Sequence, residues 1–148
     1  MKIALASDHG GYYLKEHLKC FLRTMEYKWE DYGTYNSEAV DYPDYGLKAA
    51  QSVAQGDCQA GILICGTGIG MSIVANKVKG IRASLCTNSY MAKCSKEHNH
   101  ANILVLGARV LGNGLAEDIV KTWLSTETAG GRHQRRVDKI NALDRSKN

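Results

Sequence analysis

A short segment, residues 61–70 with the sequence GILICGTGIG, combines a thiol with closely spaced glycines. Its first four residues are apolar, which is typical of a strand buried on both faces of a parallel sheet. Cys65 follows this strand, and glycines at 66, 68 and 70 allow positive φ and let the backbone amides turn toward a bound anion. Such a setting beside a helix N-terminus favours the thiolate form. The segment fits either a base or nucleophile beside a phosphate or enolate site, or a tight turn with a small buried cysteine.

Three familiar glycine loops do not match this segment. A dinucleotide loop has the pattern GxGxxG after the first strand, whereas this loop has GxGxG after the third predicted strand. A Walker loop ends in Gly-Lys-Ser/Thr, but Gly70 is followed by Met71. A cysteine phosphatase loop closes with an arginine about six residues after its cysteine, where this chain again has Met71. These differences disfavour a nicotinamide cofactor, ATP and phosphoryl transfer to Cys65.

Two histidine clusters could carry acid–base chemistry. Asp8 and His9 follow the first predicted strand, where a carboxylate and an imidazole could work on hydroxyl groups or could simply form a capped turn. His98, Asn99 and His100 offer a proton donor or acceptor beside an amide. The alternative for this second cluster is a polar helix terminus, where histidine complements the helix dipole.

The net charge of +4 comes entirely from the C-terminal segment. Residues 132–148 contain six Lys or Arg and two Asp, and the rest of the chain is balanced. Arg132 and Arg136 lie one helical turn apart with His133 beside them, so they can present cations to a small phosphate ester, or they can form a solvated face. Because no aromatic residues are interleaved with them, we favour the phosphate ester over a nucleic acid. Apolar residues spaced by three along this segment predict a helix that docks on another surface.

Strands alternate with helices along the whole chain. Apolar runs predict strands at 2–6, 27–32, 60–64, 81–85 and 103–106, and periodic patterns predict helices at 13–25, 45–54, 72–78, 89–97, 115–124 and about 131–145. This order predicts an α/β fold, a three-layer α/β/α Rossmann-like sandwich with a five-stranded parallel sheet and an extra C-terminal helix.

The predicted sheet groups distant residues at one edge. In such folds ligands bind outside the carboxyl ends of the strands. Asp8, His9, the loop after Cys65, and Arg109 after the fifth strand therefore share one edge. His98 ends the helix before the fifth strand, which places it at the opposite edge unless the loop turns back or a second subunit contributes to the site.

Length and composition narrow the protein class. The chain of 148 residues matches one domain spanning residues 1–148, and 44% hydrophobic with 23% charged residues is normal for a soluble protein. No apolar run reaches the length of a membrane span, and the first residues lack the apolar region of a signal peptide, so we expect a cytoplasmic location and no membrane partner. Five scattered cysteines argue against a disulfide framework or a structural zinc site.

Taken together, seven short motifs closely resemble the type B ribose-5-phosphate isomerases, which are grouped with the galactose-6-phosphate isomerase subunits. They are SDHGG at 7–11, DYP at 41–43, CGTGIG at 65–70, ANK at 75–77, GIRA at 80–83, HN at 98–99 and GGRHQRR at 130–136. The resemblance spans residues 2 to about 142. It implies an aldose–ketose isomerase that needs no metal and no other cofactor.

The resemblance also implies roles for individual residues. Cys65 would be the base that moves the proton, and the loop amides would hold the forming enediolate; some relatives use a glutamate at the position of Met71, so this chain fits the cysteine branch. Thr67 and His98 would assist ring opening. The implied substrate contacts are Asp8, His9, Tyr42, Gly66, Gly68, Ile69, Gly70 and Asn99, and the implied phosphate contacts are Arg109, Arg132, His133 and Arg136.

We therefore expect an isomerase of ribose 5-phosphate and ribulose 5-phosphate, working as a homodimer or tetramer with the site at the subunit interface and the C-terminal helix exchanged with or docked on a partner. Pocket depth is not readable from sequence, so an isomerase of allose 6-phosphate or galactose 6-phosphate is the first alternative. A non-catalytic sugar-phosphate sensor is the second. A nucleic-acid-binding role for the basic helix is a third and is not expected.

Overall fold

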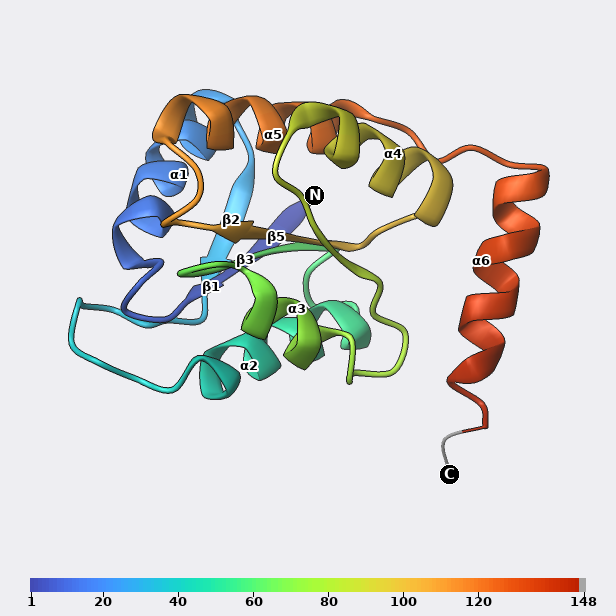
Figure 1. The fold of residues 1–148 in the computed structure, drawn as a ribbon, viewed down its shortest axis with the longest axis horizontal. Helices are drawn as coiled ribbons and strands as arrows, with labels where there is room; N and C mark the ends of the chain where they lie inside the picture. Colours follow the sequence, from blue (N-terminus) through green and yellow to red (C-terminus); the bar gives the residue numbers. More distant parts are fainter. Residues whose placement is uncertain (147–148) are drawn as a thin grey trace.

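The five predicted strands form one parallel sheet in a computed structural model that describes residues 1–146 (Figure 1). The strand order is β2-β1-β3-β5-β4, and every neighbouring pair is parallel. The strands are β1 (Lys2–Ser7), β2 (Lys28–Asp31), β3 (Ala60–Cys65), β4 (Ala83–Leu85) and β5 (Ile103–Gly107). The predicted Rossmann-like α/β fold is thereby confirmed.

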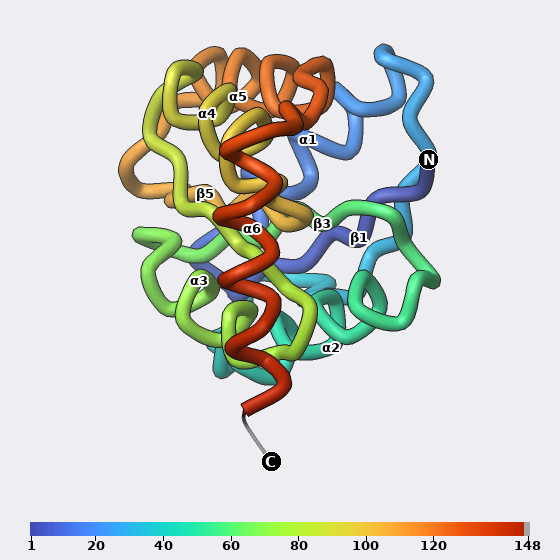
Figure 2. Tube along the Cα trace, turned by 90° about the vertical axis from the view of Figure 1, so that its right-hand side faces the viewer, coloured from blue at the N-terminus to red at the C-terminus, as the bar shows by residue number. Residues whose placement is uncertain are grey.

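Helices cover both faces of the sheet. One face carries α1 (Tyr12–Thr24), α4 (Ser89–Asn99) and α5 (Asn113–Ser125), and the other carries α2 (Tyr42–Gln55) and α3 (Ile69–Ala75) (Figure 1). The last helix, α6 (Arg132–Leu143), belongs to neither layer. Figure 2 shows it running along the side of the molecule from the level of α4 to that of α3.

The core has two halves because side chains of a strand alternate between the faces of the sheet. On β3, Ile62 and Ile64 pack with α1 and α5, whereas Leu63 and Cys65 pack with α2 and α3. All six residues of this strand are buried. The thiol therefore ends a fully buried strand and faces the layer of α2 and α3.

The chain reverses its strand order between β1 and β3. After β1 it enters α1 on one face of the sheet, and after β3 it enters α3 on the opposite face. The two connections leave the neighbouring carboxyl ends in opposite directions, which opens a crevice between them. This crevice is where the fold itself favours a ligand site.

Most helix boundaries differ from the predicted ones by up to three residues, and three of the helices show why. The helix α3 begins at Ile69 rather than 72 and ends at Ala75, because Gly68 turns the chain with φ 81° just before it. The helix α2 begins at Tyr42 rather than 45, with the only proline in its first turn. The helix α4 continues through Asn99 and ends where His100 takes a left-handed φ of 49°.

A buried ion pair connects α1 to β2 and to the loop that leads into α2. The Lys15 ammonium group is fully buried and donates hydrogen bonds to Asp31 Oδ1 at 2.5 Å and to the Thr34 carbonyl oxygen at 2.6 Å. Burial alone would raise the pKa of Asp31, but hydrogen bonds from Lys15, the Gly33 amide and Lys19 hold that pKa below its usual value. Burial lowers the pKa of Lys15. The pair fixes the start of the loop that leads to Tyr42, the first residue of α2.

Residues 1–146 contain no helix with the length and apolar character needed to span a membrane. They also contain no group of three or more His, Cys, Asp or Glu side chains arranged to hold a metal ion. The cytoplasmic location stays a prediction.

Candidate active site

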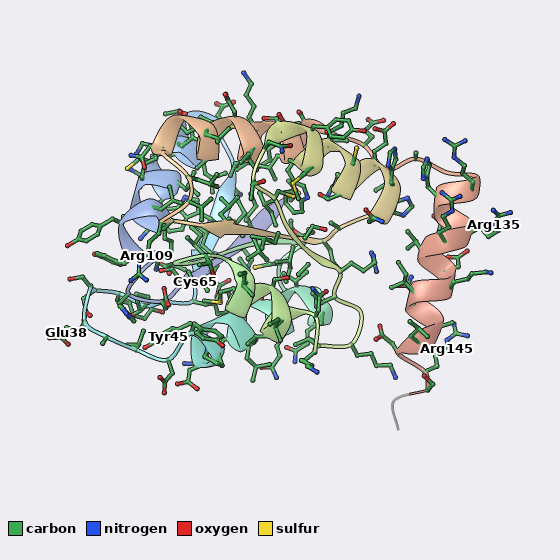
Figure 3. All side chains as sticks on the ribbon, viewed as in Figure 1. Glu38, Tyr45, Cys65, Arg109, Arg135 and Arg145 are labelled. Atoms are coloured by element: carbon green, nitrogen blue, oxygen red, sulfur yellow. The ribbon has the colours of Figure 1, made fainter. Side chains whose placement is uncertain are left out.

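A cleft of about 390 Å³ lies outside the carboxyl ends of β1, β3 and β5. Its walls bring together residues from four separate segments of the chain: Asp8, Tyr42, Cys65, Gly66, Thr67, Ile69, Gly70, Ile73 and Arg109. Figure 3 shows Cys65 and Arg109 on the same side of the molecule. Most of the residues predicted at this edge of the sheet therefore line one cleft.

Cys65 is the last residue of β3 and is only 5% exposed. Its Sγ accepts a hydrogen bond from the Gly68 amide, with 3.2 Å between nitrogen and sulfur. Gly68 takes a left-handed φ of 81°, and a side chain there would lie 2.5 Å from Leu85 Cδ1. Only glycine fits this position, so the backbone brings a hydrogen-bond donor to the sulfur. A donor in this place stabilises negative charge on sulfur.

The other two glycines of the loop do not take a positive φ. They matter instead because they leave room for neighbouring side chains. A Cβ atom at Gly66 would lie 3.1 Å from Arg109 Nη1, and one at Gly70 would lie 2.6 Å from the Tyr42 ring. The Arg109 amide also donates to the Gly66 carbonyl oxygen at 2.9 Å. The missing side chains thus let a guanidinium group and a phenol ring rest directly on the loop.

Charge in the cleft comes from one cation and one carboxylate. Within residues 1–146, Arg109 forms no ion pair with an acidic side chain, so its charge is available to an anionic ligand. Asp8 is 8% exposed, and its Oδ1 accepts a hydrogen bond from the Gly11 amide at 3.0 Å. The other carboxylate oxygen makes no hydrogen bond among the described residues. A ligand hydroxyl group can donate to it.

Three further predicted contact residues lie at or near the rim. Thr67 and Ile69 are exposed, and the Thr67 hydroxyl group accepts a hydrogen bond from the Ile69 amide at 3.2 Å. His9 does not line the cleft. Its Nδ1 accepts a hydrogen bond from the Val40 amide at 3.2 Å, which holds the loop that precedes α2.

A second group of predicted residues lies where α4 meets α6. The rings of His98 and His133 stack with centroids 4.2 Å apart and planes 4° from parallel. Burial and the neighbouring His98, Arg132 and Arg136 side chains lower the pKa of His133. Asn99 is the last residue of α4. Two histidines, an amide and two guanidinium groups thus form a cationic corner, defined here as His98, Asn99, Arg132, His133 and Arg136.

A single chain does not bring the cationic corner to the cleft. The helix α4 ends just before the amino end of β5, whereas Cys65 lies at the carboxyl end of β3, and the two strands are parallel. The corner and the cleft are therefore at opposite edges of the sheet. Figure 3 shows α6, with Arg135 and Arg145, far across the molecule from Cys65.

The sequence analysis missed Ile73 in the cleft wall and the role of Gly107. Ile73 lines the cleft one helical turn after Ile69, and it is 57% exposed. The i, i+4 spacing from Ile69 was the available signal. Gly107 was also missed. A Cβ atom there would lie 2.6 Å from the Thr67 carbonyl oxygen, so its absence lets the cleft loop pack against β5.

Comparison with known proteins places the chain in a family. The sequence pattern of the family described as Ribose/Galactose Isomerase matches residues 3–140. The chain belongs to this family. The resemblance seen in the motifs is confirmed, and it covers nearly the whole chain.

Relatives in this family match over almost their full length. A putative sugar phosphate isomerase of Bacillus subtilis is 52% identical, and the match covers 95% of each chain. Ribose-5-phosphate isomerase B of Escherichia coli is 46% identical over 99% of each chain. Among solved structures, ribose-5-phosphate isomerase B of Clostridium thermocellum is 57% identical and superposes with a TM-score of 0.98 over 100% of each chain.

Proposed function

We propose that this protein interconverts ribose 5-phosphate and ribulose 5-phosphate. The observation that carries the proposal is the Cys65 sulfur at the carboxyl end of β3, held by the Gly68 amide in a cleft that also contains Asp8 and Arg109. A base, hydrogen-bond donors and a cation are the groups that this reaction needs. Family membership and the names of the full-length relatives support the same activity.

The reaction moves one proton between adjacent carbons. In the open-chain aldose the proton on C2 is weakly acidic because the neighbouring carbonyl group can take up the electron pair. The Cys65 thiolate removes this proton, and negative charge develops on the C1 oxygen of an enediolate. Backbone amides of the loop 66–70 stabilise that charge. The Cys65 thiol then returns the proton to C1 while a proton moves from the C2 hydroxyl group to the C1 oxygen, which gives the ketose.

Thr67 and His98 are proposed to open the sugar ring before proton transfer, and the remaining predicted residues hold the substrate. Asp8 accepts a hydrogen bond from a sugar hydroxyl group, and His9 supports this wall of the cleft. Tyr42 and Ile69 border the sugar. Binding energy from the phosphate group positions the reacting carbons at the thiol.

We further propose that two copies of the chain build each site. The cleft of one copy supplies Cys65 and Arg109, and the cationic corner of the partner supplies the residues that a single chain leaves at the opposite edge. Apolar surface beside both regions supports this arrangement: Ile69 and Ile73 at the cleft are 54% and 57% exposed, and Leu143 on α6 is 61% exposed. A two-fold dimer would create two identical sites.

The second candidate substrate is a six-carbon sugar phosphate, because the description of the family includes galactose. The experiment that decides is a side-by-side measurement of kcat/KM on ribose 5-phosphate, allose 6-phosphate and galactose 6-phosphate. The largest kcat/KM on ribose 5-phosphate is the expected result. A larger value on either six-carbon substrate would replace the proposed substrate.

A second experiment separates the enzyme from a sugar-phosphate sensor. In deuterated water an isomerase incorporates deuterium from solvent at the carbon that exchanges its proton. A sensor would bind ribose 5-phosphate without this exchange, and binding without deuterium incorporation would therefore contradict the proposed activity.

A further inference from the structure

Arg82, the residue before β4, contacts two elements that both belong to the cationic corner. Its Nε donates hydrogen bonds to the carbonyl oxygens of Asn99 at 3.1 Å and His100 at 3.2 Å, and its Nη2 donates to the His100 oxygen at 2.9 Å. Its Nη1 donates to Asn141 Oδ1 at 2.9 Å. One side chain thus joins the end of α4 to the second half of α6.

The contacts of Arg82 with α4 fix the orientation of the last helical turn. The carbonyl groups at the end of a helix have no partner within the helix and carry partial negative charge. The planar guanidinium group satisfies two of them at once, where His100 turns the chain out of the helix with φ 49°. A lysine, with a single charged nitrogen, cannot reproduce this fork. The turn that Arg82 holds carries His98 and Asn99.

The contact of Arg82 with α6 matters because this helix has little apolar anchoring within its own chain. Val137 is the only buried residue of α6, and Ile140 and Leu143 are 43% and 61% exposed. Polar contacts must therefore set the position of the helix. They include Arg82 to Asn141 and the Gly80 amide to Asp144 Oδ2 at 2.8 Å.

The guanidinium group of Arg82 donates its hydrogen bonds to neutral oxygen atoms. Within residues 1–146 it forms no ion pair with a carboxylate. Burial lowers the pKa of Arg82, and the nearby Asp144 carboxylate partly opposes this shift. Here the half-buried guanidinium group has every observed contact directed to α4 or α6.

We propose that Arg82 is a positioning residue that sets the spacing between His98 and Asn99 on α4 and the arginines of α6. It would hold the ring-opening group and the phosphate anchors at the separation that one sugar phosphate requires. This inference rests on the proposed function for its catalytic consequence. The spacing itself is a property of the corner and is measurable without turnover.

Two substitutions separate the contacts that Arg82 makes with the end of α4 from its contact with α6. Arg82→Met keeps the apolar stem of the side chain and removes both sets of hydrogen bonds, so we expect kcat on ribose 5-phosphate to fall about tenfold and KM to rise about tenfold. Asn141→Ala removes only the hydrogen bond to α6. We expect it to raise KM about threefold and to leave kcat within about twofold of wild type. Arg82→Lys should recover only part of the loss, because it restores the charge without the fork.

The matched control is Lys139→Met, which removes one positive charge from α6 at an exposed position with no hydrogen bond or ion pair among the described residues. It should behave as wild type. A purely structural role for Arg82 predicts a different pattern, in which melting temperature and active fraction fall while KM of the remaining enzyme is unchanged. That pattern would overturn the inference. So would a KM for ribose 5-phosphate that is the same in Asn141→Ala as in Lys139→Met.

A second readout is independent of activity. The stacked rings of His98 and His133 shift each other's imidazole proton resonances, and this shift reports the distance between α4 and α6. We expect Arg82→Met to reduce the shift and Lys139→Met to keep it. An unchanged shift in folded Arg82→Met overturns the inference even if the wild type is active. A reduced shift in Arg82→Met, found together with a wild-type protein that lacks isomerase activity, would support the spacing and refute only the proposed function.

Discussion

The cleft around Cys65 and the cationic corner are built by different means. In the cleft the Cys65 sulfur, the proposed base, ends a strand that is buried along its whole length, and glycines let backbone and side chains approach closely. In the corner the charged groups project from α6, an exposed helix with one buried residue, and from the end of α4. Proton transfer requires accurate placement of the proposed base, whereas the proposed phosphate anchors hold the substrate without reacting with it.

This difference predicts different consequences of mutation. Changes at Cys65 in the cleft should act on kcat, since this thiol is the proposed base. Changes to the arginines of the corner should act on KM, since they are the proposed phosphate contacts. The arginines of the corner also lie on a surface helix. Such a helix can bind a second copy of the chain without disturbing the core of its own chain.

Removal of the thiol is expected to have the largest effect on turnover. Cys65→Ala eliminates the base, and we expect kcat to fall about a thousandfold, in the range typical of general-base catalysis. Binding of ribose 5-phosphate, measured by calorimetry, should change only slightly. Cys20→Ala, at an exposed cysteine on α1, is the control for loss of a thiol. Unchanged turnover in Cys65→Ala would remove the thiol from the mechanism.

Loss of the buried Lys15 tests whether the cleft depends on a rigid frame. Lys15→Met leaves the Asp31 carboxylate without its closest partner, and we expect the free energy of unfolding to fall by about 3 kcal/mol. Urea denaturation measures this. The exposed pair between Lys2 and Glu30 provides the control, since Lys2→Met should leave the unfolding midpoint unchanged. Equal midpoints for the two variants would show that the buried pair does not stabilise the fold.

The same pair predicts how stability depends on pH. Because the pKa of Asp31 is lowered in the folded state, its contribution is fully present above the unfolded pKa of about 3.9 and is lost as pH falls through the folded pKa. Asp31→Asn should therefore be less stable than wild type at neutral pH, and the difference should shrink in acid. A difference that stays constant from neutral to strongly acidic pH would contradict the assigned direction of the pKa shift.

A smaller effect is expected in the corner. Arg136→Ala removes one charged hydrogen-bond donor from the phosphate site, so KM for ribose 5-phosphate should rise about tenfold, with kcat nearly unchanged. Activity on phosphate-free ribose should be indifferent to the change. Arg135→Ala is the matched control, because Arg135 lies next to Arg136 on α6 and adjacent residues of a helix do not share a face. Equal losses for ribose and ribose 5-phosphate would contradict the phosphate role.

Much of the cleft was predictable from sequence because strand ends are easy to locate. Cys65, Asp8 and Arg109 each follow an apolar strand, and parallel strands bring their carboxyl ends to one edge. The same reasoning placed His98 at the opposite edge, where the structure has it. The fold class needed only the alternation of strands and helices.

The remaining features depend on contacts between distant segments. The fit of the Tyr42 ring over Gly70 has no local signal, and neither does the strand order. A lysine in an amphipathic helix is expected to face water, so the burial of Lys15 follows only from the position of Asp31 on a different element. The start of α3 was placed too late because glycines have low helix propensity.

The central claim is that cleft and corner from different copies form one site, and a mixing experiment tests it most directly. The Cys65→Ala variant and the Arg132→Ala, Arg136→Ala double variant should each be nearly inactive at low ribose 5-phosphate concentration. When they are unfolded and refolded together, mixed dimers contain one site with an intact thiol and intact arginines. We predict recovery of about a quarter of wild-type activity by statistical pairing. Activity no higher than the sum of the two separate variants would contradict the shared site.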